Sequence, residues 1–223
     1  MPKQLRIDFV SDVSCPWCAI GLKSLETALL RIGGEVTVDL HFQPFELNPN
    51  MSPDGQDIVE HVTQKYGATA EQQAKSREMI RQRGAEVGFT FDMERRGRIY
   101  NTFDAHRLLS WAEQEGSQRA LKMALLEAYF TRCEDPSNHD VLLRAVEHVG
   151  LDREVAARIL SSNDYADEVR EREQFFQRAG IHSVPAIIIN QRHLISGGQP
   201  PEVFEQALRE IAARGDEAPA AAQ

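Results

Sequence analysis

Two cysteines separated by two residues are the part of the sequence best suited to chemistry, and they stand in the segment Cys15-Pro16-Trp17-Cys18. Pro16 fits the first position of a helix, which leaves Cys15 at or near the N-cap. The unpaired N–H groups and the positive dipole end of a helix start favour a thiolate, so we expect Cys15 to be the nucleophile. Cys18 follows one turn later on the same face, and we expect it to be the resolving thiol.

The composition favours a soluble globular chain of 223 residues, of which 42% are hydrophobic and 26% are charged. A formal net charge of −9 argues against nucleic acid as a partner. The sequence shows no apolar segment of signal-peptide or membrane-spanning length, so we expect a cytoplasmic protein that does not act in a membrane. In that compartment a Cys-x-x-Cys favours redox or metal chemistry over a structural disulfide.

Apolar periodicity predicts four strands and a long helical block that interrupts them. The strands are expected at residues 5–10, 36–42, 186–190 and 193–196. The helices are expected at residues 16–32, 56–66, 70–84, 99–115, 117–132, 138–149, 152–161 and 165–179 and from residue 201 onward, with one short extended piece at 89–91. We therefore expect an α/β domain made of residues 1–55 and 164–214, a helical insertion domain at 56–163 and a disordered tail at 215–223.

This order of elements resembles the thioredoxin fold with a large all-helical insertion, as in the DsbA family. Further motifs resemble its FrnE-like branch: Ser11-Asp12-Val13-Ser14 before the cysteine pair, Asn101-Thr102 with Ala105-His106-Arg107-Leu108, Ala128-Tyr129-Phe130, and Ser196-Gly197-Gly198-Gln199-Pro200. The segment Ile181-His182-Ser183-Val184-Pro185 departs from the family, which usually has a glycine before Val-Pro.

The resemblance implies a thiol–disulfide oxidoreductase without a bound cofactor, whose partners are protein or peptide thiols and disulfides and for which glutathione could be a redox partner. It also implies that Pro185 is cis and lies beside the cysteine pair, with Val184 and Trp17 contacting an extended substrate. Asp12 would relay a proton to or from the thiols, or would serve only as a cap or turn residue.

Four other residues have a functional and a structural interpretation. His182 could stabilise the Cys15 thiolate or be an idle surface histidine. Asn101 and His106 belong to the resembling motif of the helical block and either face the substrate groove or serve packing and capping. Cys133 has no cysteine nearby, so we expect an inert, half-buried thiol rather than a third redox cysteine.

Three other functions are considered. A zinc site would need ligands that Cys133 and the scattered histidines do not supply at the usual spacing. A glutathione-dependent transferase or isomerase of the kappa-class or 2-hydroxychromene-2-carboxylate type shares the split architecture, but has a serine in place of the first cysteine. A non-catalytic binding module would leave the cysteine pair inert. The sequence determines neither the direction of the redox reaction nor the oligomeric state, and it predicts that residues 56–163 form a lid over the cysteine pair.

Overall fold

The computed structural model describes residues 3–214, and a four-stranded sheet organises them. Its strands are β1 (Lys3–Ser11), β2 (Val36–Pro44), β5 (Ala186–Ile189) and β6 (His193–Ser196), in the order β2-β1-β5-β6. β1 is parallel to β2 and antiparallel to β5, and β5 is antiparallel to β6. The fold is the expected α/β thioredoxin-like fold with a helical insertion. The tail predicted at 215–223 lies outside the described residues.

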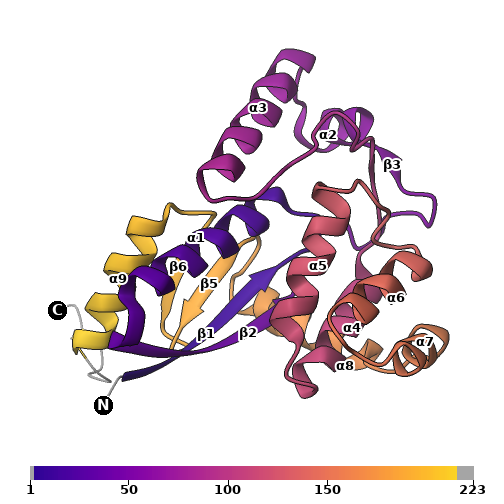
Figure 1. Ribbon diagram of the computed structural model, residues 1–223. Coiled ribbons are helices and arrows are strands. Elements are labelled where there is room, and N and C mark those ends of the chain that lie inside the picture. Colours follow the sequence, from indigo (N-terminus) through magenta and orange to yellow (C-terminus); the bar gives the residue numbers. More distant parts are fainter. Residues whose placement is uncertain (1–2, 215–223) are drawn as a thin grey trace.

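The helices begin and end close to the predicted positions. They are α1 (Pro16–Ile32), α2 (Ile58–Tyr66), α3 (Ala70–Glu86), α4 (Phe103–Gln114), α5 (Gln118–Phe130), α6 (His139–His148), α7 (Arg153–Ser161), α8 (Ala166–Arg178) and α9 (Pro201–Arg214), with a short 3-10 helix η1 at Gly33–Glu35. Figure 1 shows α1 and α9 side by side over the sheet, α2 and α3 above the start of α1, and α4 to α7 grouped beyond β2.

The predictions were wrong in two places within the helical block. The helices predicted from residues 56 and 99 begin later, at 58 and 103, because residues 56–57 and 98–99 pair as the antiparallel strands β3 (Gln56–Asp57) and β4 (Arg98–Ile99). Residues 89–91 are not extended into a strand. The rings of Phe89 and Phe91 are instead both buried and pack against each other and against Phe130, so the alternation reflected loop packing.

Alternating side chains of β1 place the active-site helix on one face of the sheet. Leu5, Ile7 and Phe9 are buried in one cluster with residues of α1 and α9. Val10 points to the opposite face, where it packs with Phe176 of α8. Helices thus pack on both faces of β1, and this packing fixes the position of its carboxyl end, where α1 starts.

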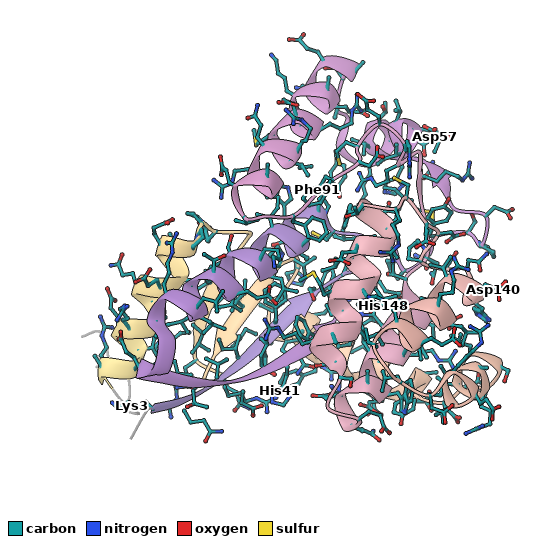
Figure 2. All side chains as sticks on the ribbon, viewed as in Figure 1. Lys3, His41, Asp57, Phe91, Asp140 and His148 are labelled. Atoms are coloured by element: carbon teal, nitrogen blue, oxygen red, sulfur yellow. The ribbon has the colours of Figure 1, made fainter. Side chains whose placement is uncertain are left out.

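The helical block shares the apolar core of the sheet domain. Leu126, Tyr129 and Phe130 of α5 belong to the cluster that contains Cys15 and Cys18. Phe91 belongs to it too, and Figure 2 shows this residue in the loop that follows α3. The division into two domains therefore stays a prediction, since the two parts bury one core together. Within residues 3–214, no helix is both long and apolar enough to cross a membrane.

A charged network joins the edge strand β2 to the helical block. His41, labelled on β2 in Figure 2, contacts Glu113 of α4 at 2.7 Å and Asp39 at 2.9 Å. Glu113 also pairs with Arg172 of α8 at 2.7 Å. Burial alone lowers the pKa of His41, but the carboxylates of Asp39 and Glu113 raise it above its ordinary value. This network holds α4 and α8 against β2.

Candidate active site

The helix start that was predicted for the cysteine pair is present. Pro16 is the first residue of α1 and Cys15 is its N-cap, with extended backbone angles of −94° and 114°. The Cys15 side chain makes no capping hydrogen bond. Its sulfur lies at the N-terminus of the helix, where the positive end of the dipole favours a negative charge. The sulfur lies 3.6 Å from the carbonyl oxygen of Val184, toward which its thiol donates.

Cys18 lies deeper than Cys15. Cys15 is 3% exposed, whereas Cys18 is completely buried, and both are free thiols. Burial and the neighbouring Cys15 raise the pKa of Cys18 well above its ordinary value, while Lys122 and a backbone hydrogen bond from Asp12 act in the opposite direction. The two thiols therefore differ in burial, and the deeper Cys18 suits the resolving role.

The proline loop packs directly on α1. The Val184–Pro185 peptide bond is cis, as the resemblance implied. A Cβ added to Gly21 would lie 3.1 Å from Cγ of Pro185 and 3.3 Å from Cα of Gly198. Glycine at position 21 thus allows the helix, the proline loop and the loop after β6 to meet, which sets the Val184 carbonyl beside Cys15.

Asp12 is neither exposed nor the N-cap of α1. Its carboxylate is 1% exposed and accepts hydrogen bonds from the backbone N–H of Leu47 at 2.8 Å, from the Ser14 hydroxyl at 2.9 Å and from the Ser14 N–H at 3.2 Å. Nε2 of His106 lies 3.5 Å from Oδ1, within range of electrostatic attraction but without hydrogen-bond alignment. Burial alone would raise the pKa of Asp12, but His106, the Leu47 N–H and Lys122 lower it to about 2.

We predict that Asp12→Asn destabilises the protein by about 2 kcal/mol at pH 7. The folded-state pKa is depressed from 3.8 to about 2, so the charge stabilises the fold above about pH 4 and this contribution is lost as the pH falls toward 2. Urea unfolding of wild type and variant should therefore show a gap that narrows below pH 4. A gap that stays constant down to pH 2 would contradict the electrostatic origin.

The matched control for this prediction is Asp57→Asn. Asp57 is exposed and caps α2 by accepting hydrogen bonds from the N–H groups of Val59 and Glu60. Asparagine caps helices about as well as aspartate, so we expect a change below about 0.5 kcal/mol at pH 7.

The structure brings some of the other predicted residues to the cysteine pair and not others. His106 is 2% exposed and faces Asp12 rather than an open groove. Asn101 precedes the N-cap Thr102 of α4, and its side chain accepts a hydrogen bond from the N–H of Phe103 at 2.8 Å, in agreement with a structural role at the helix start. Trp17 is half-buried on the core cluster of the cysteines. His182 is exposed, and none of the polar contacts found within residues 3–214 joins it to Cys15.

Cys133 follows α5 and is half-buried, as expected, in a left-handed backbone conformation. Its thiol donates toward the carbonyl oxygen of Asp92 at 3.5 Å, and burial raises the pKa of Cys133. Within the described residues, no three His, Cys, Asp or Glu side chains are grouped so that they could hold a metal ion. The zinc alternative thus gains no support from the part of the chain that the structure describes.

Three residues near the site were missed by the sequence analysis. Lys122 of α5 is 1% exposed and interacts electrostatically with Cys18, Asp12 and Cys15. Lys65 and Tyr66 end α2 near the site: Nζ of Lys65 donates to the carbonyl oxygen of Leu47 at 2.7 Å, and the charge of Cys15 reaches Tyr66. The one available signal was that Lys122 interrupts an otherwise apolar helix face.

Comparison with known proteins agrees with this geometry. The model of the DSBA-like thioredoxin domain family matches residues 6–209. The uncharacterized protein YwbO of Bacillus subtilis is 26% identical over 205 residues, which cover 92% of this chain and 96% of that protein.

Solved structures extend the comparison. A probable DsbA oxidoreductase from Streptomyces coelicolor is similar to this chain with a TM-score of 0.86 and 31% identity, covering 98% of this chain and 94% of that one. The cytosolic disulfide reductase DsbM from Pseudomonas aeruginosa, solved with GSH, has a TM-score of 0.65 at 15% identity, covering 92% of this chain and 98% of its own. At that identity the likeness shows the fold alone.

Proposed function

Because this chain belongs to the DSBA-like thioredoxin domain family, we propose that it catalyses thiol–disulfide exchange on protein or peptide substrates through Cys15 and Cys18. The observation that carries the proposal is the asymmetry of the two thiols. Cys15 stands at the N-terminus of α1 beside the Val184 carbonyl, and Cys18 is completely buried one turn later. A helix start stabilises a thiolate, which is the nucleophilic form.

In the reductive direction, the Cys15 thiolate attacks one sulfur of a substrate disulfide, and the other substrate sulfur leaves as a thiolate. Cys18 then attacks the Cys15 sulfur of the mixed disulfide, which releases the second substrate thiol and leaves a Cys15–Cys18 disulfide. The reverse sequence oxidises a substrate dithiol. Both electrons pass between sulfur atoms, so the exchange itself needs no bound cofactor, and we propose glutathione as the redox partner that restores the starting state.

The surroundings of Cys15 favour extended chains over compact substrates. The residue is 3% exposed, and the half-buried Trp17 and Val184 pack against the same core cluster. An extended peptide can pair its main chain with the backbone beside Pro185 and so present a disulfide to a recessed sulfur. We propose that α2 and α3, which lie above the start of α1 in Figure 1, act as the lid that limits access.

The test is equilibration with glutathione buffers of graded ratio, followed by trapping of free thiols with a maleimide. We expect Cys15 and Cys18 to titrate together as a two-electron couple, with a tenfold change in the equilibrium constant for about 30 mV. Cys15→Ser serves as the unreactive control. A pair that stays in one redox state at every ratio would contradict the proposal and favour a non-catalytic binding module.

A comparison of a protein substrate with a small disulfide tests the substrate class. Reactivation of scrambled ribonuclease should be faster per disulfide than exchange with oxidised glutathione, if an extended chain supplies the additional main-chain contacts. A rate advantage for the small disulfide would instead favour the alternative of a glutathione-dependent enzyme.

A further inference from the structure

Lys122 is the ionisable side chain that the proposed exchange leaves unexplained. It lies in the middle of α5 and is 1% exposed, although a buried lysine is costly unless its surroundings compensate. Leu126 and Tyr129 follow on the same face of α5 at helical spacing, and both belong to the core cluster that contains Cys15 and Cys18. The face of α5 that carries Lys122 is therefore packed toward the cysteine pair.

The ionisable neighbours of Lys122 come from three elements. Cys18 and Cys15 from α1 and Asp12 from the segment before α1 interact with it electrostatically. His106 and Ser110 of α4 and the carboxyl end of β2 surround, together with Lys122, a packing gap that has no room for a water molecule. Cys18, Asp12, His106 and Lys122 are each at most 2% exposed, so bulk water does not screen their interactions.

The protonation preferences of these groups are complementary. Burial lowers the pKa of Lys122, against the opposing charges of Cys18, Asp12 and Cys15. Burial and Cys15 raise the pKa of Cys18. Burial thus favours the neutral thiol of Cys18 and the neutral amine of Lys122, two groups that interact electrostatically. Asp12 is the poorer acceptor, because its pKa is about 2, but its negative charge favours the ammonium form of Lys122.

We propose that Lys122 holds the proton that Cys18 gives up during resolution of the mixed disulfide. This inference rests on the proposed thiol–disulfide exchange and assigns a proton-holding residue to it. As the proton moves from the Cys18 thiol to the Lys122 amine, the thiolate attacks the Cys15 sulfur, the Cys15–Cys18 bond forms, and the bond from Cys15 to the substrate breaks. The substrate leaves as a thiolate, and the ammonium later gives its proton to solvent. In the reverse reaction the ammonium protonates Cys18 as it leaves.

The experiment separates the two steps with an aryl disulfide, Ellman's reagent, mixed with the reduced protein under stopped flow. Attack by Cys15 releases the first coloured thiolate, and resolution by Cys18 releases the second. For Lys122→Met we expect the first phase to stay within about tenfold of wild type, since Cys15 keeps its helix N-terminus. We expect the second phase to slow on the order of 100-fold at pH 7 and to rise about tenfold per pH unit.

Two further variants distinguish proton transfer from charge and from packing. Lys122→Arg keeps a positive charge, but arginine does not deprotonate, so its second phase should stay as slow as that of Lys122→Met. Leu126→Ala opens a cavity one turn away on the same face and should leave the ratio of the two phases unchanged. Restoration of the second phase by arginine, or an equal slowing in Leu126→Ala, would overturn the proposal.

A measurement on the wild-type protein keeps the test decisive if the Lys122 variants fail to fold. Between about pH 6 and pH 10, the second phase should rise and then level off before the pH at which an ordinary lysine titrates, because burial lowers the pKa of Lys122 and so frees its amine earlier. A second phase that rises tenfold per unit throughout this range would mean that hydroxide removes the proton, and the inference would fail. Absence of the first phase would instead reject the proposed exchange itself, so the two failures are distinguishable.

Discussion

Replacing Cys18 with alanine should convert the protein into a trap for its substrates. Cys15 keeps its place at the start of α1 and still attacks a disulfide, but no second thiol one turn away displaces the substrate. A neighbouring group reacts with an effective concentration of roughly 10⁵ M, whereas free glutathione acts at millimolar levels, so loss of the mixed disulfide should slow by at least about a thousandfold. Mass spectrometry without reductant should find the adduct on Cys15.

Two single-cysteine variants control this experiment. Cys15→Ala should form no adduct, because Cys18 is completely buried and its pKa is raised. Cys133→Ala should behave as wild type, since its thiol donates toward the Asp92 carbonyl and burial raises its pKa, which disfavours the reactive thiolate. If Cys15→Ala accumulates adducts and Cys18→Ala does not, the roles of nucleophile and resolving thiol are reversed.

The second large effect is expected at Arg107, whose replacement by methionine should destabilise the protein by about 3–5 kcal/mol. The buried guanidinium donates to the carbonyl oxygens of Asp164 at 2.9 Å and Ser162 at 2.6 Å, to that of Ile159, and to the Asp104 carboxylate at 2.8 Å. Methionine fills the space but donates nothing, so the carbonyls at the end of α7 are left without this partner.

Urea unfolding measures this loss, and Arg153→Met at the start of α7 is the matched control. Arg153 is exposed and pairs with Glu147 at 2.8 Å, so its removal should cost less than about 1 kcal/mol. Per folded molecule, Arg107→Met should exchange with glutathione at the wild-type rate. A destabilisation below 1 kcal/mol would show that other donors replace the guanidinium.

Local rules predicted the active-site helix well because its signals lie within a few residues. Pro16 fixed where the helix begins, and the alternation before it fixed β1. The turn at Asn190-Gln191 was also local, and both residues adopt the left-handed conformation that joins β5 to β6. The fold followed from the order of such elements.

The parts that were wrong or missed depend on contacts between distant segments. β3 and β4 are two residues each, too short for any periodicity, and exist because they pair with each other. Lys122 shares a helix face with apolar residues in the sequence, but its burial depends on the packing of α5 against α1 and α4. Asn101 and His106 came from one motif, yet one accepts a hydrogen bond at a helix start and the other faces Asp12, a difference that spacing does not encode.

Leu47 lies between α2 and the buried charges. Its N–H donates to the Asp12 carboxylate, while its carbonyl oxygen accepts from Lys65 at the end of α2. Both backbone polar groups of Leu47 are thus hydrogen-bonded. An outward movement of α2 that displaces Lys65 would therefore also strain the hydrogen bond between the Leu47 N–H and Asp12. The proposed lid is therefore connected to the buried carboxylate beside the cysteine pair through a single backbone residue.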